Sequence, residues 1–243
     1  MVEQESHKLH VGSSILPRVT KDKYGMFKLP FDTPYTFSEL VNLSRTQAKQ
    51  DLFVLAMFEG KTKGTFLELG AGRPIINSNC QLLERYFDWS GVSIDILPIT
   101  GWEEQRKQSQ YVIADATEYD YSGIDNYFDY LQIDIDDPIG QTKILQLLAD
   151  KEFGVVTLEH DVFERKAEYF AWKNFARKYF TSRGYVMLAD NLCVNIGDWK
   201  TNCFEDWYVN PKVIRQEVIS AYQNLTLDYR LKYGEDVLFT QND

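Results

Sequence analysis

The feature of this sequence that most restricts its fold is an alternation, from Gly64 onward, of short apolar runs with longer amphipathic ones. The short runs have the length and the β-branched or aromatic content of buried strands, whereas the longer runs follow the 3.6-residue period of a helix. Strands that alternate with helices indicate a mostly parallel sheet covered by helices on both faces. We therefore expect an α/β, doubly wound, Rossmann-like domain.

The pattern predicts five strands in succession, with helices between several of them. The predicted strands are 65–69, 91–94, 111–114, 130–133 and 155–158, and the clearest helices are 78–87, 139–149 and 164–182. Two further strands, 185–188 and 192–196, lie close enough to pair around a turn at 189–191. We therefore expect a mostly parallel seven-stranded sheet that ends in a C-terminal antiparallel hairpin.

A leader precedes this pattern. Proline and glycine interrupt its first part, which we expect to be irregular, and two capping boxes then predict two helices, the second of which stops at Gly60. The boxes are Thr36 with Glu39 and Ser44 with Gln47. We expect residues 1–63 to pack on a domain of residues 64–243, so that the chain forms one folded unit.

Composition narrows the possible partners and location. With 243 residues, of which 44% are hydrophobic and 26% charged, the chain suits one globular domain. Its net charge of −10 disfavours nucleic acid as a partner, because affinity for a phosphate backbone comes mainly from Lys and Arg. No apolar stretch approaches the roughly 20 residues that span a bilayer, and no signal peptide is evident. The three cysteines lack paired spacing, so we expect reduced thiols in a cytoplasmic protein without a membrane partner.

The strongest motif follows the first predicted strand of the sheet and runs Phe-Leu-Glu-Leu-Gly-Ala-Gly over residues 66–72. In an open α/β sheet, ligands bind beyond the carboxyl ends of the strands, and glycines there allow the backbone to approach a ligand closely. Glu68 lies next to this turn and could face the amino group of a zwitterionic cofactor. A nicotinamide-dinucleotide fingerprint would have a third glycine where this chain has Ile75. A glycine turn without any ligand is the structural alternative.

Acidic residues also end the next two predicted strands. Asp95 follows the second strand, where a carboxylate can accept both ribose hydroxyls of an adenosine-type ligand. Asp115 follows the third strand, where a carboxylate can accept the adenine amino group. One such acid could be a solvated loop residue, but Glu68, Asp95 and Asp115 end three successive strands. We interpret them as a cofactor site.

These motifs resemble the FkbM-type methyltransferases, most specifically between residues 51 and 98. The resemblance runs through Asp-Leu-Phe-Val at 51–54, Gly-Thr-Phe-Leu-Glu-Leu-Gly-Ala-Gly at 64–72, Asn-Ser-Asn at 77–79, Leu-Leu-Glu at 82–84 and Trp-Ser-Gly-Val at 89–92. It implies S-adenosylmethionine as methyl donor and O-methylation, often of sugars or secondary metabolites. The cofactor-binding residues that we expect are Glu68, Gly70, Ala71, Gly72, Asn79, Asp95, Ile96, Asp115, Ala116 and Asp134.

The candidates for catalysis follow the fourth and fifth predicted strands, which are neighbours in this topology. They are Asp134, Asp136, Glu159 and His160. Methyl transfer requires the acceptor oxygen to be aligned and its proton removed, and His160, Asp134 or Asp136 could be the base. A cluster of hard oxygen ligands could instead hold Mg²⁺ or Ca²⁺ and lower the acceptor's pKa. Some of these acids could simply cap helices, as Asp161 could at the start of the long helix.

Three functions remain open. The first is a methyltransferase acting on a hydroxyl of a small molecule or glycan. The second is a nicotinamide-dependent oxidoreductase, which is disfavoured by Ile75 and by the closing hairpin, since purely parallel dinucleotide folds lack that hairpin. The third is a methyltransferase-like binding protein without activity, favoured by the irregular Asp-Asp-Pro at 136–138.

Overall fold

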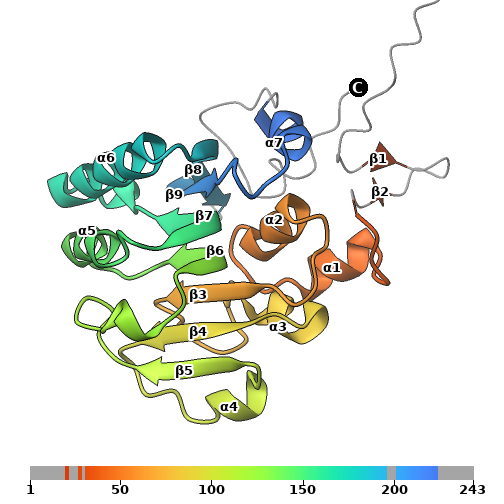
Figure 1. The fold of residues 1–243 in the computed structure, drawn as a ribbon, viewed down its shortest axis with the longest axis horizontal. Helices are drawn as coiled ribbons and strands as arrows, with labels where there is room; N and C mark the ends of the chain where they lie inside the picture. The colour runs from red at the N-terminus through yellow and green to blue at the C-terminus, as the bar shows by residue number, and fades with distance from the viewer. Residues whose placement is uncertain (1–19, 22–26, 29–30, 196–200, 224–243) are drawn as a thin grey trace, which may run out of the picture.

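The structure, a computed structural model, describes residues 20–21, 27–28, 31–195 and 201–223. Its centre is one seven-stranded sheet in the order β5-β4-β3-β6-β7-β9-β8 (Figure 1). The strands are β3 (Thr65–Leu69), β4 (Ser90–Asp95), β5 (Ser109–Ile113), β6 (Tyr127–Ile133), β7 (Glu152–Glu159), β8 (Val186–Asn195) and β9 (Thr201–Val209). The first five are parallel to one another, and β9 runs antiparallel to both β7 and β8. The predicted fold class is therefore confirmed.

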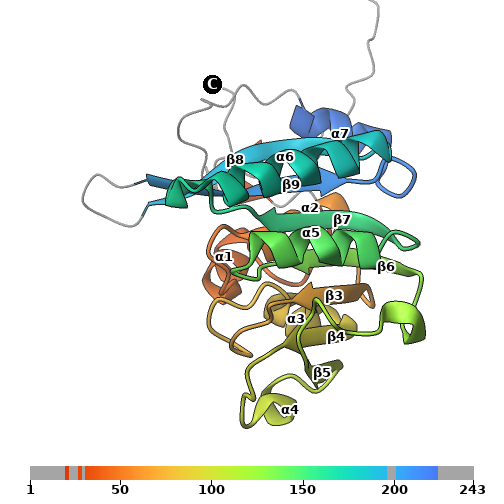
Figure 2. The same ribbon diagram turned by 90° about the vertical axis from the view of Figure 1, so that its left-hand side faces the viewer.

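Helices cover both faces of the sheet (Figures 1 and 2). On one face lie α5 (Pro138–Leu147) and α6 (Ala167–Ser182), and on the other lie α1 (Phe37–Leu43), α2 (Gln50–Met57), α3 (Gln81–Phe87) and α7 (Gln216–Gln223). The short elements are β1 (Thr20–Lys21), β2 (Phe27–Lys28), α4 (Trp102–Gln105) and the 3₁₀ turns η1 (Tyr121–Gly123) and η2 (Val162–Glu164). The buried apolar side chains accordingly form two clusters, one on each side of the sheet.

The local sequence explains how the long helix and the N-terminal helices pack. In α6, the fully buried Trp172, Ala176 and Phe180 recur every four residues and make one apolar stripe against the sheet. On the opposite face, the ring of Phe53 in α2 stacks on that of Trp207 in β9, with the ring centroids 4.3 Å apart. These contacts fix α2 and α6 on opposite sides of the same strands.

One of the two predicted capping boxes is present. The Thr36 hydroxyl accepts the Glu39 N–H at 3.2 Å, and the Glu39 carboxylate accepts the Thr36 N–H at 2.7 Å. The box predicted at Ser44 and Gln47 is wrong, because α2 begins only at Gln50, after a left-handed Lys49. Ser44 instead donates its hydroxyl to the buried Asp51 carboxylate at 2.7 Å, and this bond ties the preceding loop to the helix.

The hairpin exists, but its predicted segments are wrong. Residues 186–195 form one strand, β8, and its antiparallel partner is β9 at 201–209. The expected turn at 189–191 is an irregularity within β8, where the pairing register shifts and Asn191 is left-handed with a φ of 52°. A polar Asp-Asn pair in an otherwise apolar run is typical of both a turn and a bulge, and pairing with β9 decides between them.

The cysteine prediction is also wrong for two of the three residues. A disulfide joins Cys193 of β8 to Cys203 of β9, whereas Cys80 is a buried free thiol. The two partners face each other across the hairpin, a proximity that their spacing in the sequence does not reveal. Disulfides are rare in reducing compartments, so the thiol-based argument for a cytoplasmic location no longer holds, and that location stays a prediction. Among the described helices, none has the length and hydropathy that crossing a membrane requires.

Candidate cofactor and catalytic site

The site lies where the direction of the chain connections reverses. The connection after β3 leads to β4 on one side, and the connection after β6 leads to β7 on the other, although β3 and β6 are neighbours. Such a reversal opens a crevice at the carboxyl ends of the strands. Here a cavity of about 610 Å³ occupies that position. Seven of the predicted cofactor-binding residues line it: Gly70, Gly72, Asp95, Ile96, Asp115, Ala116 and Asp134.

The two glycines of the turn have different structural roles. Gly70 has a φ of 78°, and a Cβ on it would lie 1.7 Å from the backbone oxygen of Asp134, so this position accepts only glycine. Gly72 has a φ of 57°, but a Cβ there would meet nothing within 4 Å. Gly70 therefore permits the close packing of β3 on β6, and Gly72 keeps the floor of the cavity free of a side chain.

Both predicted cofactor acids are anchored by the backbone at the edge of the cavity. The two carboxylate oxygens of Asp95 accept the N–H groups of Gly72 at 2.7 Å and Leu97 at 2.8 Å. The Asp115 carboxylate accepts the Thr117 N–H at 2.8 Å, and hydrogen bonding by Thr117 lowers the pKa of Asp115. Each carboxylate oxygen retains a free lone pair, so both acids can accept hydrogen bonds from a ligand in the cavity.

The remaining three predicted cofactor residues lie away from the lining of this cavity. Ala71 is buried and donates its N–H to the backbone oxygen of Ile94 at 3.2 Å. Asn79 is buried in the segment that leads to α3. Glu68 projects from β3 into the protein, where its carboxylate accepts the Ser93 hydroxyl at 2.6 Å and pairs with the guanidinium of Arg106 at 3.3 Å. Glu68 is thus held by protein groups rather than by the cavity.

Two predicted catalytic carboxyls come together at the ends of β6 and β7. Asp134 and Glu159 are hydrogen-bonded to each other, which requires one of them to carry a proton. Burial raises the pKa of Asp134 to about 6, although the hydrogen bond from Glu159 opposes this rise. Burial and the charge of Asp134 raise the pKa of Glu159 well above its usual range. Burial and mutual repulsion therefore favour a single proton shared by the pair.

Two further acids border this pair. Asp136 is exposed and lines the cavity, as an acceptor-side residue should. Asp161 makes no capping hydrogen bond, so the cap considered for it is absent. It sits in a left-handed conformation with a φ of 45°, and burial together with the charges of Asp134 and Asp136 raises its pKa to about 7. An acid in a strained backbone position beside Asp134 is a further catalytic candidate, for which the sequence had also offered the role of a helix cap.

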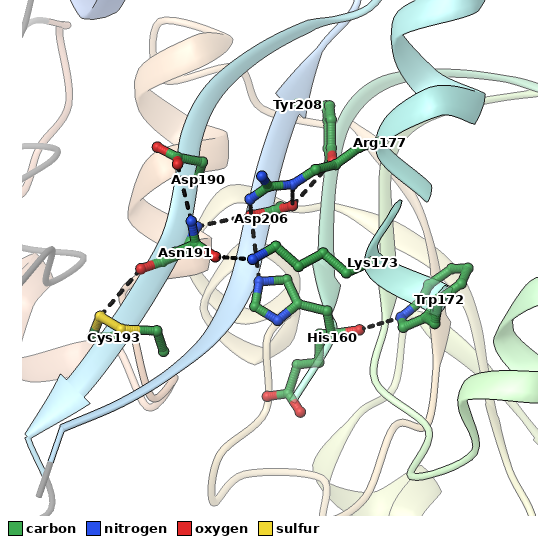
Figure 3. Close-up of polar contacts among 11 residues, drawn as sticks. His160, Trp172, Lys173, Arg177, Asp190, Asn191, Cys193, Asp206 and Tyr208 are labelled. Atoms are coloured by element: carbon green, nitrogen blue, oxygen red, sulfur yellow. Dashed lines mark hydrogen bonds and ion pairs between the residues drawn. A yellow bond between two sulfur atoms is a disulfide. The ribbon is translucent and has the colours of Figure 1, made fainter. Parts of the chain in front are cut away.

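The fourth predicted catalytic residue, His160, points away from this group. Figure 3 shows its ring directed toward Asp206 of β9 beneath α6, and its Nε2 lies 3.4 Å from an Asp206 oxygen. Asp206 also accepts two hydrogen bonds from Arg177, at 2.7 and 2.8 Å. His160 is fully buried, and burial lowers its pKa. His160 follows the end of β7 and lies beside Asp206, away from the pair formed by Asp134 and Glu159.

Glu205 is a buried acid that sequence analysis missed. It pairs in register with Glu159 across the β7–β9 ladder, and its carboxylate accepts the side-chain amide of Gln50 at 2.8 Å. Burial raises the pKa of Glu205 to about 8. The apolar run Trp-Tyr-Val at 207–209 could have indicated this buried strand, β9, but no local pattern marks Glu205 itself.

The described residues contain no preformed cage of metal ligands. Within the described part of the chain, no group of three or more His, Cys, Asp and Glu side chains is placed to hold an ion. Among the acids after β6 and β7, Asp134 and Glu159 bond to each other, and Asp136 and Asp161 lie beside this pair. His7 and His10 of the leader lie outside the described residues.

Comparisons with known proteins leave the family of this chain open. No family model matches the chain, and no curated protein matches it, so membership of the FkbM family stays a prediction. Among solved structures, the chain is similar to an rRNA methylase from Streptococcus thermophilus, with 10% identity, a TM-score of 0.48, and coverage of 66% of this chain and 93% of the other.

Two further similar structures are of proteins that either depend on S-adenosylmethionine or contain it. One is a TehB-like SAM-dependent methyltransferase from Corynebacterium glutamicum, with 12% identity, a TM-score of 0.45, and coverage of 72% and 94%. The other is fibrillarin from Aeropyrum pernix with bound S-adenosyl-L-methionine, with 12% identity, a TM-score of 0.41, and coverage of 61% and 67%. These identities are low, so a function for this chain has to rest on its own residues.

Proposed function

We propose that this chain is an S-adenosylmethionine-dependent methyltransferase that methylates a hydroxyl group of a small molecule or glycan. One observation carries the proposal: the glycine turn, Asp95 and Asp115 border a single cavity at the carboxyl ends of the strands. These groups come from three successive strands. A glycine turn without a ligand would not require two backbone-anchored acids beside it.

Residues that line this cavity can bind both the ribose and the adenine of an adenosyl cofactor. The proposed role of Asp95 is to accept the ribose hydroxyls, since both of its oxygens are fixed by backbone N–H groups. Asp115 would accept the adenine amino group, and the exposed Ile96 would contact the adenine ring. Gly72 leaves room for the rest of the molecule. When bound, this cofactor supplies a methyl group already activated by its sulfonium.

The protein then has to align the acceptor hydroxyl and accept its proton. Asp134 is the proposed base because it lines the cavity, whereas its partner Glu159 does not. Glu159 would hold Asp134 in position through their hydrogen bond. Asp136, which also lines the cavity, is the alternative base. We assign no catalytic step to His160, which faces Asp206, and none to a metal, for which the described residues form no cluster of three or more ligands.

The acceptor class follows from charge and resemblance. Asp134, Asp136 and Asp137 line the cavity after β6, and the chain carries a net charge of −10, so a nucleic-acid acceptor is disfavoured. The FkbM resemblance favours a sugar or secondary-metabolite hydroxyl. A nicotinamide-dependent oxidoreductase is the weaker alternative, because Ile75 occupies the third glycine position and β9 runs antiparallel.

A methyl-transfer assay tests this proposal. Purified protein is incubated with methyl-labelled S-adenosylmethionine and a panel of mono- and oligosaccharides and phenolic or aliphatic alcohols, with and without a chelator. We expect label to appear in at least one hydroxyl-bearing acceptor, and the chelator to leave the rate unchanged. Cofactor binding without methyl transfer to any acceptor would instead indicate a binding protein. Loss of activity in the presence of the chelator would show that a metal takes part in the reaction.

A further inference from the structure

We infer that Arg106, which does not touch the cavity that we propose for the cofactor, is a positioning residue that fixes the glycine turn in its ligand-binding conformation. This inference rests on the proposed function, since it concerns affinity for the adenosyl cofactor. Arg106 is fully buried behind the turn, on the face of the sheet that carries α3. It is the group to which Glu68, predicted from the sequence to face the cofactor, is bound.

Three segments around the turn meet at the Arg106 guanidinium. Its Nε donates to Glu84 of α3 at 2.5 Å, its Nη1 donates to the Ser78 hydroxyl at 2.8 Å, and its Nη2 donates to Glu68 at 3.3 Å. Glu68 precedes Gly70 by two residues on β3, and Ser78 lies on the segment that leads from Gly72 into α3. One side chain thus holds the turn on both of its sides and joins it to the helix that follows.

Arg106 also connects to the loop that carries Asp95. The guanidinium lies 5.1 Å from the ring centroid of Trp102, and this ring stacks on Tyr111 with the centroids 4.1 Å apart. The Tyr111 hydroxyl donates to the backbone oxygen of Leu97 at 2.5 Å. Leu97 in turn donates its N–H to Asp95. A continuous set of contacts therefore runs from the glycine turn, through Arg106, to the proposed ribose-binding acid.

The chemistry of this cluster fits positioning better than simple packing. Burying a cation with two carboxylates is expensive, and hydrophobic residues of similar volume often stabilise a protein as well or better. A planar guanidinium, however, can donate hydrogen bonds to several acceptors at fixed angles, which a lysine ammonium cannot. What Arg106 provides, beyond stability, is a defined relative placement of Glu68, Ser78 and Glu84.

The experiment compares Arg106→Lys, which keeps the charge but loses the fork, with the parent protein. If the turn is then competent for only about a tenth of the time, affinity for S-adenosylhomocysteine falls about 10-fold. We measure the dissociation constant by calorimetry below the unfolding range, and amide hydrogen exchange of residues 66–80 in the absence of ligand. Exchange should quicken by at least about 10-fold in that segment, because the open form changes from the minor to the major population.

Lys61→Met provides a matched control. Lys61 pairs with the buried Asp129 at 2.7 Å, close to Thr65 at the start of β3 and therefore at the opposite end of the strand from the glycine turn. We expect this variant to melt at a lower temperature but to bind S-adenosylhomocysteine with the parental affinity. Ser78→Ala is a milder second variant, which removes one Arg106 contact and keeps the ion pairs. It should weaken binding by about 3-fold, because a single hydrogen bond to a charged group is lost.

The outcomes separate this inference from the proposed function. The positioning role is overturned if folded Arg106→Lys and Ser78→Ala both bind S-adenosylhomocysteine as tightly as the parent and exchange amide hydrogens at the parental rate. Binding by the parent would in that case still support the methyltransferase proposal. Equal weakening in Lys61→Met would show a general stability effect and would also overturn it. If the parent binds no S-adenosylhomocysteine, the proposed function fails and the cofactor role of Arg106 fails with it. Quickened exchange would then show only that Arg106 orders the turn.

Discussion

The two halves of the candidate site are built in contrasting ways. The cofactor half, made by the ends of β3, β4 and β5, presents backbone turns and carboxylates that the backbone anchors at the edge of an open cavity. The acceptor half, made by β6, β7 and β9, contains Asp134, Glu159 and Glu205, three carboxyls whose pKa values burial raises. The first half is suited to holding a ligand by shape and hydrogen bonds. The second is suited to exchanging a proton.

The largest effect should come from the two glycines of the cofactor half. Gly70→Ala places a Cβ against the Asp134 backbone in a left-handed conformation, so we expect stability to fall by more than about 3 kcal/mol. Gly72→Val meets open space, and its backbone strain should cost about 1–2 kcal/mol. It should keep the fold, as judged by far-ultraviolet circular dichroism, but lose cofactor binding. Normal binding by Gly72→Val would mean that this turn is only structural.

Charge removal in the acceptor half should act on the rate and much less on binding. Asp134→Asn keeps the shape and removes the proposed base, so methyl transfer should slow by about 10²–10⁴-fold. The dissociation constant for S-adenosylhomocysteine, measured by calorimetry, should change far less. Asp136→Asn is the matched comparison, since Asp136 lines the same cavity. A large rate loss in Asp136→Asn with a normal rate in Asp134→Asn would move the base to Asp136.

The same contrast predicts different pH profiles for rate and affinity. Because the pKa of Asp134 is raised to about 6, the rate should increase about 10-fold per pH unit below that value and level off above it. Hydrogen bonding keeps the pKa of Asp115 low, so it stays ionised over the whole range. The affinity for S-adenosylhomocysteine should therefore be flat between pH 5.5 and about 8. An affinity that changes with pH in the same way as the rate would contradict the view that the two halves of the site titrate separately.

A smaller effect should appear in the stability of the ligand-free protein. The folded pKa values of Asp161 and Glu205, about 7 and about 8, lie above those of an unfolded chain. These acids hold protons more tightly when folded, so their stabilising effect is complete below about pH 4 and is lost as the pH rises through 7 to 8. We expect the melting temperature to fall between pH 6 and about 8.5, and to fall less steeply in Glu205→Gln. Equal slopes in the two proteins would contradict this view of Glu205.

The sequence could predict the cofactor half better than the acceptor half, because its signals are local. The glycine turn, Asp95 and Asp115 each end a recognisable strand, and parallel strands bring their carboxyl ends to one edge. Glu68 was misplaced because its partner, Arg106, lies 38 residues further along the chain. No local pattern indicates that a carboxylate beside a glycine turn faces inward toward a distant guanidinium.

The acceptor half depends on pairings that the sequence does not encode locally. The strand β9 contains two consecutive acids, Glu205 and Asp206, which argue against a buried strand until their partners are known. Those partners are Gln50, 155 residues away in α2, and Arg177 in α6. His160 was assigned to the site for a related reason: its position after a strand was visible, but the face it occupies depends on Asp206.

The central claim is that the cavity holds an adenosyl methyl donor, and thermal stabilisation by ligand tests it most directly. A ligand at 100 times its dissociation constant stabilises the folded state by about 2.7 kcal/mol, which is a rise of about 5–10 °C for a chain of this size. We expect S-adenosylhomocysteine to raise the melting temperature of the parent protein by that amount, and to leave Gly72→Val unchanged. NAD at the same concentration should have no effect on either protein. Stabilisation by NAD without stabilisation by S-adenosylhomocysteine would contradict the account.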